Sequence, residues 1–300
     1  MRRAPVSRGV WYGIAANVVW GLSPIYWKQL DQLPAPVLVA HRVLWSALTL
    51  GVLFLLFHHR LRLEARPPAR RVAGICVLAA ILICTNWLIY VWAVTTGYII
   101  EASLGYFITP LVSVGLGVLM LRERLRPGQW AAVGLASGGL LYLTSSLGRL
   151  PWIALALATS FGLYGLVKKT APLGAVQGLS AETGLLCLPA AAFLLWGPDA
   201  TPSGALDNGV VLLFLAGSGA VTVLPLLLFT ASVRRIPLSH LGIIQYLAPT
   251  LQLLLGVLLY GEPLSRTQLV GYGLVWGALI LFGAEGLYAQ RARPLPTSRA

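Results

Sequence analysis

Ten apolar segments follow one another along this sequence, and short loops separate them. Each is close to the ~20 residues that an α-helix needs to cross the hydrocarbon core of a bilayer. They cover residues 10–28, 35–57, 72–95, 102–121, 128–146, 151–167, 175–196, 209–231, 238–260 and 266–288. Because 57% of the residues are hydrophobic and 10% are charged, the chain cannot cover a soluble globule with polar surface. The sequence therefore predicts an all-α integral membrane protein with ten transmembrane helices. It leaves no room for a soluble catalytic domain, and we expect no enzyme.

The second half of the sequence repeats the first. Residues 110–141 match residues 249–280 without a gap, and twelve of the thirty-two pairs are identical. A weaker match at an offset of 141 places Trp20-Gly21-Leu22 over Phe161-Gly162-Leu163. These matches predict two five-helix repeats, residues 9–146 and 150–288, between an N-terminal segment 1–8 and a basic tail 289–300. Since five crossings are an odd number, the second repeat would be inverted in the membrane, an arrangement found in secondary transporters.

The net charge of +13 is concentrated in alternate loops. Eighteen Arg and Lys residues, Lys168 and Lys169 among them, fall on one predicted side, against Lys28, Arg149 and Arg266 on the other. Loops rich in basic residues stay cytoplasmic, so we expect both termini in the cytoplasm and the protein in the inner (plasma) membrane. The excess charge then favours contact with anionic lipids of the bilayer rather than with nucleic acid.

Several stretches of the sequence resemble a known family. They are WGLSPIYWK (20–28), AHRVLWS (40–46), SLGYFITPLVSVGLGVL (103–119), SFGLYGLVKK (160–169), LPLLLFTASVRRIPLS (224–239) and LGIIQYLAPT (241–250). In this combination they resemble the EamA-type transporters of the drug/metabolite transporter superfamily, and most closely the RarD family of chloramphenicol-sensitivity permeases. The resemblance implies ten helices, cytoplasmic termini and efflux or exchange of a small organic solute.

Two ionisable residues interrupt the predicted spans. Arg42 lies seven residues into segment 35–57, and Glu182 lies seven residues into segment 175–196. Because an ionised group near the bilayer centre costs roughly 2.5–3.5 kcal/mol on insertion scales, both should face an internal cavity. Two interpretations stay open: the charges contact substrate or are linked to proton movement, or they form an internal ion pair that locks the halves together. His41, which corresponds to Glu182 at the offset of 141, either titrates with Glu182 in proton coupling or is a neutral hydrogen-bonded side chain.

Polar and aromatic residues within the spans are candidates for the solute pathway, since aromatic walls suit a flat apolar body by stacking and cation–π contacts. Interhelical packing is the alternative for each of the aromatic residues. Pro110 and Pro249 correspond in the repeat and are candidate hinges, or static bends. The pathway candidates are Trp20, Arg42, Asn86, Tyr90, Tyr106, Phe107, Tyr164, Glu182, Gln245 and Tyr246.

Other repeated residues have structural interpretations. The pairs Gly134/Gly138 and Gly273/Gly277 predict close packing of segments 128–146 and 266–288. Glu123 and Glu262 stand in turns and are interpreted as helix-entry residues. Ser265 to Gln268 reads as a capping box, and Pro127 as a first-turn residue.

The sequence as a whole favours a secondary transporter of an amphipathic metabolite, amino acid or drug that works by alternating access. A passive facilitator or channel, and a non-transporting membrane assembly subunit, are the alternatives. We expect no metal and no cofactor, because neither a metal-ligand spacing nor a phosphate-binding loop is present. The expected partners are the solute, the bilayer and possible coupling protons, and the expected state is a monomer or a weak homodimer.

Overall fold

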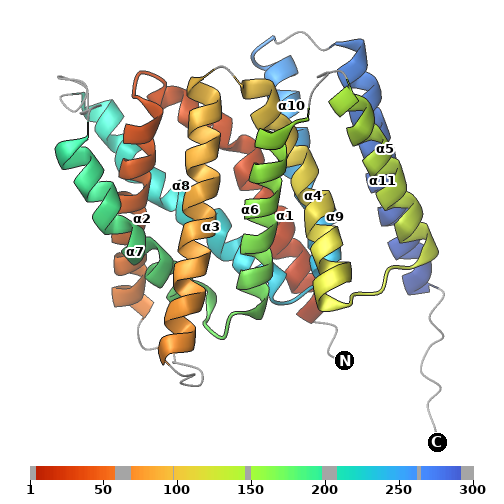
Figure 1. The fold of residues 1–300 in the computed structure, drawn as a ribbon, viewed down its shortest axis with the longest axis horizontal. Helices are drawn as coiled ribbons and strands as arrows, with labels where there is room; N and C mark the ends of the chain where they lie inside the picture. The colour runs from red at the N-terminus through yellow and green to blue at the C-terminus, as the bar shows by residue number, and fades with distance from the viewer. Residues whose placement is uncertain are drawn as a thin grey trace, which may run out of the picture.

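The chain folds into a bundle of α-helices, described here from a computed structural model (Figure 1). The structure describes residues 5–57, 69–96, 98–145, 150–197, 208–261 and 265–291. No strand occurs in these residues, which confirms the all-α prediction. The elements are α1 (Pro5–Trp27), the 3-10 helix η1 (Lys28–Leu30), α2 (Ala35–Phe57), α3 (Ala69–Thr95), α4 (Ile99–Leu121), α5 (Pro127–Ser145), α6 (Trp152–Thr170), α7 (Ala175–Trp196), α8 (Gly209–Val233), α9 (Leu238–Gln245), α10 (Leu247–Leu258) and α11 (Arg266–Arg291).

Nine of the ten predicted segments each hold one α-helix, and the segment 238–260 holds two, α9 and α10. The break between them falls at Tyr246, three residues before Pro249. Pro249 has no N–H to donate, and its ring crowds the carbonyl four residues earlier, which belongs to Gln245. The corresponding helix α4 continues through Pro110. The paired prolines therefore have different effects in the two halves, a break in one and an unbroken helix in the other.

Seven stretches within the described residues are long and apolar enough to cross a membrane. They are α2, α3, α4, α7, α8, the α9–α10 pair and α11, and they make the chain a multi-pass membrane protein. Helices α1, α5 and α6 are not apolar enough to be counted with these seven. Glycine, polar and amphipathic residues lower the mean hydropathy of α1 and α5, and the two lysines in the last turn lower that of α6. The count of ten crossings stays a prediction.

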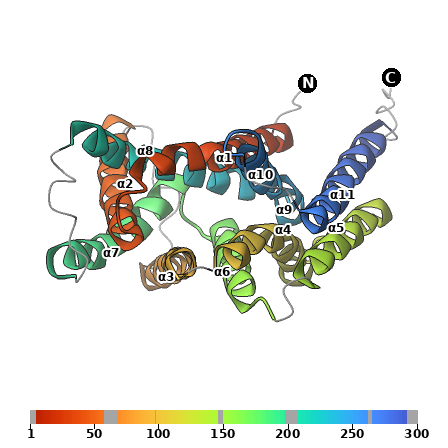
Figure 2. The ribbon, with the colours of Figure 1, turned by 90° about the horizontal axis from the view of Figure 1, so that it is seen from above.

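The helices stand in two rows when the bundle is seen from above (Figure 2). Helices α8, α1, α10 and α9 form one row, and α7, α3, α6 and α4 form the other. Helix α2 lies at one end, and the pair α5 and α11 lies at the opposite end. In the side view, α1 begins and α11 ends at the same face of the bundle (Figure 1).

Contacts between helices recur in corresponding pairs. Helix α6 packs against α3 and α4, while α1, its counterpart in the repeat, packs against α8 and α10. Two glycines allow the closest of these approaches. An added Cβ at Gly21 would lie 2.7 Å from Cβ of Leu251, and one at Gly162 would lie 2.7 Å from Cγ1 of Val112. Gly21 corresponds to Gly162 at an offset of 141, and Val112 to Leu251 at 139, so the two halves use the same packing device.

Helices α5 and α11 pack along one another, but the predicted glycine pairs are not where the two helices approach most closely. An added Cβ at Gly134, Gly138 or Gly273 would meet nothing within 4 Å, and one at Gly277 would come no closer than 3.4 Å to a leucine side chain. The close approach is instead at Gly139, whose added Cβ would lie 2.8 Å from the carbonyl oxygen of a glycine in α11. The prediction is wrong for Gly134, Gly138 and Gly273, because glycine spacing does not show how a helix is rotated, whereas Gly277 faces Leu135 of α5 at an ordinary contact distance.

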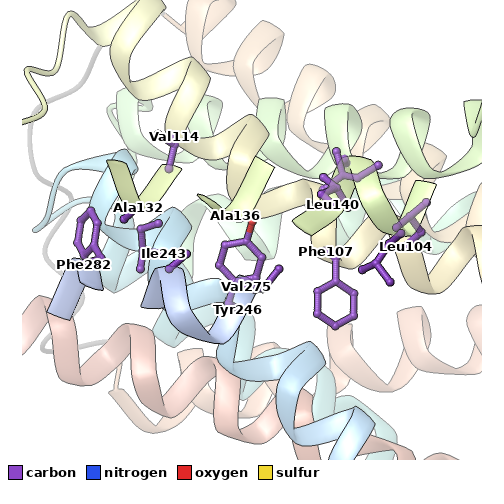
Figure 3. Close-up of a cluster of buried hydrophobic side chains, with 14 of the residues drawn as sticks. Leu104, Phe107, Val114, Ala132, Ala136, Leu140, Ile243, Tyr246, Val275 and Phe282 are labelled. Carbon is purple, nitrogen blue, oxygen red and sulfur yellow. The ribbon is translucent and has the colours of Figure 1, made fainter. Parts of the chain in front are cut away.

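An apolar core fills the space between α4, α5, α6, α9 and α11 (Figure 3). Phe107 and Tyr246, two of the predicted pathway residues, are buried in the same cluster as Ala136 and Val275. The rings of Phe107 and Tyr272 lie 4.8 Å apart between their centroids. These contacts make Phe107 and Tyr246 part of the packing that joins the two rows to the α5–α11 pair.

Side chains cap several helix starts. Ser265 and Gln268 form the predicted capping box: the Ser265 N–H donates to Oε1 of Gln268 at 2.9 Å, and the Gln268 N–H donates to Oγ of Ser265 at 3.2 Å. Helix α5 begins at Pro127, as predicted. Glu123, interpreted as a helix-entry residue, caps the start of α9 in the other half. Its carboxylate accepts from the N–H groups of Leu238 and Ser239 at 2.7 and 2.8 Å. Glu262 lies outside the described residues.

Candidate functional site

A small cavity lies where α2, α3, α7 and α8 meet. Its volume of about 10 Å³ gives room for about one water molecule. Its walls are mainly aliphatic, and the polar or aromatic lining comes from Ser46, Trp87, Glu182, Thr183 and Thr222. The lining is related across the repeat, since α2 and α7 are corresponding helices of the two halves, and so are α3 and α8. Both halves thus contribute equivalent helices to one enclosed space.

Arg42 lies beside this cavity, two turns into α2. Its Nε–H donates a hydrogen bond to Oγ1 of Thr222 at 3.2 Å. Its guanidinium carbon lies 4.5 Å from the ring centroid of Trp27 and 5.1 Å from that of Trp87, within cation–π distance of both rings. Thr222 and Trp87 also line the cavity, so the guanidinium contacts two residues of the cavity wall. Arg42 therefore faces the interior, as its cost in lipid requires.

Glu182 lines the cavity from α7 and is neutralised within its own half. Its Oε1 lies 2.7 Å from Nζ of Lys168, and its Oε2 accepts a hydrogen bond from the Tyr164 hydroxyl at 3.1 Å. The two charged side chains are only 2% and 4% exposed. The prediction that Lys168 belongs to a basic loop is wrong. Helix α6 continues to Thr170, so Lys168 stays in the last helical turn and reaches Glu182 across a short connection.

Arg42 and Glu182 do not pair with each other in the described part of the chain. Each of the two residues lies two turns into its helix, α2 or α7, and these helices begin on opposite faces of the bundle (Figure 1). The expected ion pair exists, but its cation is Lys168 rather than Arg42, and both partners belong to the second half. This ion pair therefore does not lock the two halves together.

Lys169, next to Lys168, has a different set of contacts. Its ammonium donates to the carbonyl oxygens of Val233 and Ile236 at 3.0 and 2.6 Å, at the end of α8. It also lies 3.9 Å from the Glu123 carboxylate. Basic groups are favourable at the carbonyl-rich end of a helix. Lys169 thus holds the ends of α6 and α8 together on the face where α9 is capped.

Four aromatic rings lie next to the buried ion pair. Trp20 and Phe161, which correspond in the repeat, meet edge to face with centroids 5.7 Å apart. Phe229 lies 5.6 Å from Trp20 and 5.3 Å from Phe161, and it stacks on Tyr164 at 6.4 Å. The predicted pathway residues Trp20 and Tyr164 are therefore brought together between α1, α6 and α8, with Tyr164 linking the rings to Glu182.

The remaining candidates divide between the site and the packing. Tyr90 and Tyr106 meet edge to face at 5.7 Å and lie within electrostatic reach of Arg42. Asn86 is buried and donates to the Leu157 carbonyl and to Oγ of Ser160 at 2.9 and 3.0 Å, which fixes α3 against α6. His41 is half-buried next to Arg42, and its Nε2 has no hydrogen-bond partner among the described residues. Gln245 is buried in α9, away from the cavity lining.

Four side chains that contact Arg42 or Glu182 were absent from the sequence-based candidates: Trp27, Trp87, Lys168 and Thr222. Thr222 carried a usable signal, a polar residue within an otherwise apolar segment. Trp87 follows Asn86, which was a candidate, and Trp27 corresponds to Lys168 at the offset of 141. Within the described chain, no three His, Cys, Asp or Glu side chains gather as metal ligands would.

The seven apolar spans, the enclosed cavity and the buried charges around it define a multi-pass helical membrane protein with a polar site inside the bundle. The model of the EamA-like transporter family matches the chain twice, over residues 7–145 and 150–284. The chain thus belongs to the EamA-like transporter family, as a member of its RarD group, and is a membrane transporter.

Relatives of the chain carry the same kind of name. An uncharacterized transporter of Pseudomonas aeruginosa is 44% identical over 99% of this chain and 100% of its own length. The protein RarD of Streptomyces exfoliatus is 42% identical over 94% of this chain and 90% of its own. A solved crystal structure shares the fold with a TM-score of 0.71 at 19% identity, covering 93% of this chain and 98% of that one.

Proposed function

We propose that the protein is a secondary transporter that moves a small amphipathic organic solute across the inner membrane by alternating access. Its two five-helix halves, residues 9–146 and 150–288, would be inverted relative to one another and cross the bilayer ten times. Rocking of the halves would open the cavity between α2, α3, α7 and α8 to one side and then to the other, in efflux or exchange.

The observation that carries this proposal is the origin of the cavity in equivalent helices of both halves. A site placed between repeats is the arrangement that alternating access requires. The double match to the family model and the corresponding contacts of Gly21 and Gly162 support the repeat. The start of α1 and the end of α11 on one face of the bundle support an even number of crossings.

The size of the cavity favours a transporter over a passive channel. At about 10 Å³ the cavity is too small to hold an organic solute. A channel would need a continuous polar path, whereas the lining combines aliphatic walls with separate polar groups. Solute entry then requires the helices around the cavity to separate.

Solute flux in proteoliposomes tests the proposal. Vesicles containing the purified protein would be loaded with a mixture of carboxylates, amines, amino acids and amphipathic drugs, and release would be followed with and without an inward proton gradient. We expect saturable release of one class, either driven by the gradient or dependent on solute on the opposite side. Unsaturable leakage of many classes would favour a channel, and release no faster than from protein-free vesicles would refute transport.

Cysteine accessibility tests the inverted topology. The native Cys76, Cys84 and Cys187 would first be replaced by alanine, and single cysteines would then be placed at Arg122 and Gln29. The basic residues predict that a membrane-impermeant thiol reagent, added to intact cells with a permeable outer layer, labels position 29 and spares position 122. The reverse pattern would overturn the orientation, and labelling at both positions would overturn the placement of the two loops.

A further inference from the structure

The charges around the cavity do not cancel. Glu182 already has two partners, Lys168 at 2.7 Å and the Tyr164 hydroxyl at 3.1 Å. Arg42 is not paired with a carboxylate among the described residues, since its contacts are two tryptophan rings and a threonine hydroxyl. With the tyrosines and His41 neutral, Arg42, Lys168 and Glu182 leave one positive charge in an enclosed, mostly apolar place.

The contacts of Arg42 leave part of its guanidinium available to a ligand. The ring centroids of Trp27 and Trp87 lie 4.5 and 5.1 Å from the guanidinium carbon, and the hydroxyl oxygen of Thr222 accepts a hydrogen bond from the Nε–H. A guanidinium has five N–H donors, so the four on its terminal nitrogens have no protein acceptor in the described chain. Two of them form the end-on fork that matches the geometry of a carboxylate.

We propose that the transported solute is an organic monoanion, a carboxylate on an apolar or aromatic body, whose carboxylate binds the terminal nitrogens of Arg42. This proposal rests on the proposed function, because it names the substrate class of the same cavity. The aliphatic walls and the Trp87 ring suit an apolar body. The single positive charge fits one carboxylate, whereas a phosphate dianion would leave the site negatively charged and an amine would be repelled.

The same arrangement argues against amino acids as substrates. A zwitterion brings an ammonium as well as a carboxylate, and its ammonium needs an acceptor inside the cavity. Glu182 is the only carboxylate among the described residues that line the cavity, and it is held by Lys168 and Tyr164. An amino acid would have to break this buried ion pair, so its amine-free analogue should bind better.

The test compares ligands that share a body and differ in charge. Thermal unfolding of the detergent-solubilised protein would be followed with 3-phenylpropionate, 3-phenylpropionamide, 3-phenylpropylamine and phenylalanine. Parallel series with smaller aliphatic and larger indole bodies would cover the size of the solute. We expect at least one carboxylate to raise Tm in a saturable way, and its amide, amine and amino acid counterparts to need at least about ten-fold higher concentrations.

Variants identify the residue responsible. Arg42→Gln should weaken binding of the effective carboxylate at least about ten-fold, because a charge-assisted pair is lost. Arg42→Lys keeps the charge without the fork, so it should bind more weakly than wild type but keep the preference for carboxylates. Arg235→Gln is the matched control. Arg235 also lies over an aromatic ring, Tyr12 at 5.3 Å, but it is exposed, and neither Tyr12 nor Ala231, whose carbonyl oxygen it binds, lines the cavity. Its replacement should leave binding unchanged.

Three results would overturn the proposal: equal or better binding of an amide, amine or amino acid, unchanged carboxylate binding by folded Arg42→Gln, or no Tm shift with any carboxylate in the three series. Flux of the effective carboxylate from proteoliposomes separates this proposal from the proposed function. Binding without flux would refute transport and keep the anion site, whereas saturable flux of an amine would keep transport and refute the anion site.

Discussion

Loss of one partner from the Lys168–Glu182 ion pair should destabilise the protein far more than loss of both. Both side chains are almost completely buried, and Nζ lies 2.7 Å from Oε1. In Glu182→Gln the Lys168 ammonium would stay buried without a counter-ion, and in Lys168→Met the carboxylate would keep only the Tyr164 hydroxyl. In the double variant neither charge remains, and the glutamine can still accept from Tyr164.

The expected size follows from the burial of the pair. Removal of one partner from a buried pair costs about 3–5 kcal/mol, because an uncompensated charge remains, whereas replacing both partners by neutral groups of similar volume is often neutral. Measured polar interactions between membrane helices are smaller, with an average of about 0.6 kcal/mol, because the unfolded state in lipid also finds partners. We therefore expect each single variant to lose about 2–4 kcal/mol and the double variant to lose about 1 kcal/mol or less.

Reversible unfolding in mixed micelles, followed by far-ultraviolet circular dichroism, measures these differences in a double-mutant cycle. Lys169→Met is the matched control, because the neighbouring lysine binds the backbone carbonyls of Val233 and Ile236 rather than Glu182. Its cost should be about 1–2 kcal/mol. That cost should add to the cost of Glu182→Gln.

Additive losses in Lys168→Met and Glu182→Gln would refute the reasoning, because independent residues give no coupling energy. Transport by the double variant then decides between the two open interpretations of the charges. A folded double variant that still moves the solute would make the pair structural. A folded double variant that binds the solute and does not move it would make the pair part of the transport step.

The packing of the halves gives further predictions. Gly21→Ala and Gly162→Ala should each cost about 1–3 kcal/mol by the same unfolding measurement, since an added Cβ lies 2.7 Å from a neighbouring side chain. Gly138→Ala, which meets nothing within 4 Å, should be neutral or stabilising by up to about 1 kcal/mol, and a loss there would restore the predicted glycine interface. Glu123→Gln should cost about 1–2 kcal/mol through the cap of α9, and equal stability would contradict the cap. Asn86→Ala should cost about 1–3 kcal/mol, and hydrogen exchange should then rise where α3 meets α6.

The helices could be predicted from the sequence because the apolar segments have the length of a membrane span and the loops between them are short. Every predicted segment contains at least one α-helix. The division of the segment 238–260 into two helices at Tyr246 could not be predicted. Pro110 and Pro249 have the same local effect on the backbone, yet α4 stays continuous and the second helix divides, so the surroundings decide the outcome.

The site could be predicted in part. Counting residues from a span boundary estimates the depth of Arg42 and Glu182, because each residue of a helix rises by about 1.5 Å. Depth does not give the rotation of a helix or the identity of its neighbours. Lys168 was assigned to a loop because the predicted span ended one residue before it, whereas α6 continues for one more turn and buries it. Phe107 and Tyr246 were chosen for their chemistry, but Phe107 on α4 and Tyr246 at the break between α9 and α10 are buried in the core against α5 and α11.

The repeat places different chemistry at corresponding positions of the two halves. Trp27 corresponds to Lys168, and His41, beside Arg42, corresponds to Glu182. In the first half a guanidinium lies over an indole ring, while in the second half an ammonium binds a carboxylate. The two places are therefore alike in backbone but unlike in charge, since one keeps a positive charge and the other is neutral. If the halves rock as proposed, an anion in the cavity is attracted from the Arg42 side alone. The electric field on the anion then differs between opening to one side of the membrane and opening to the other. The backbone symmetry would then supply the movement, and Arg42, which has no carboxylate partner among the described residues, would supply the choice of solute.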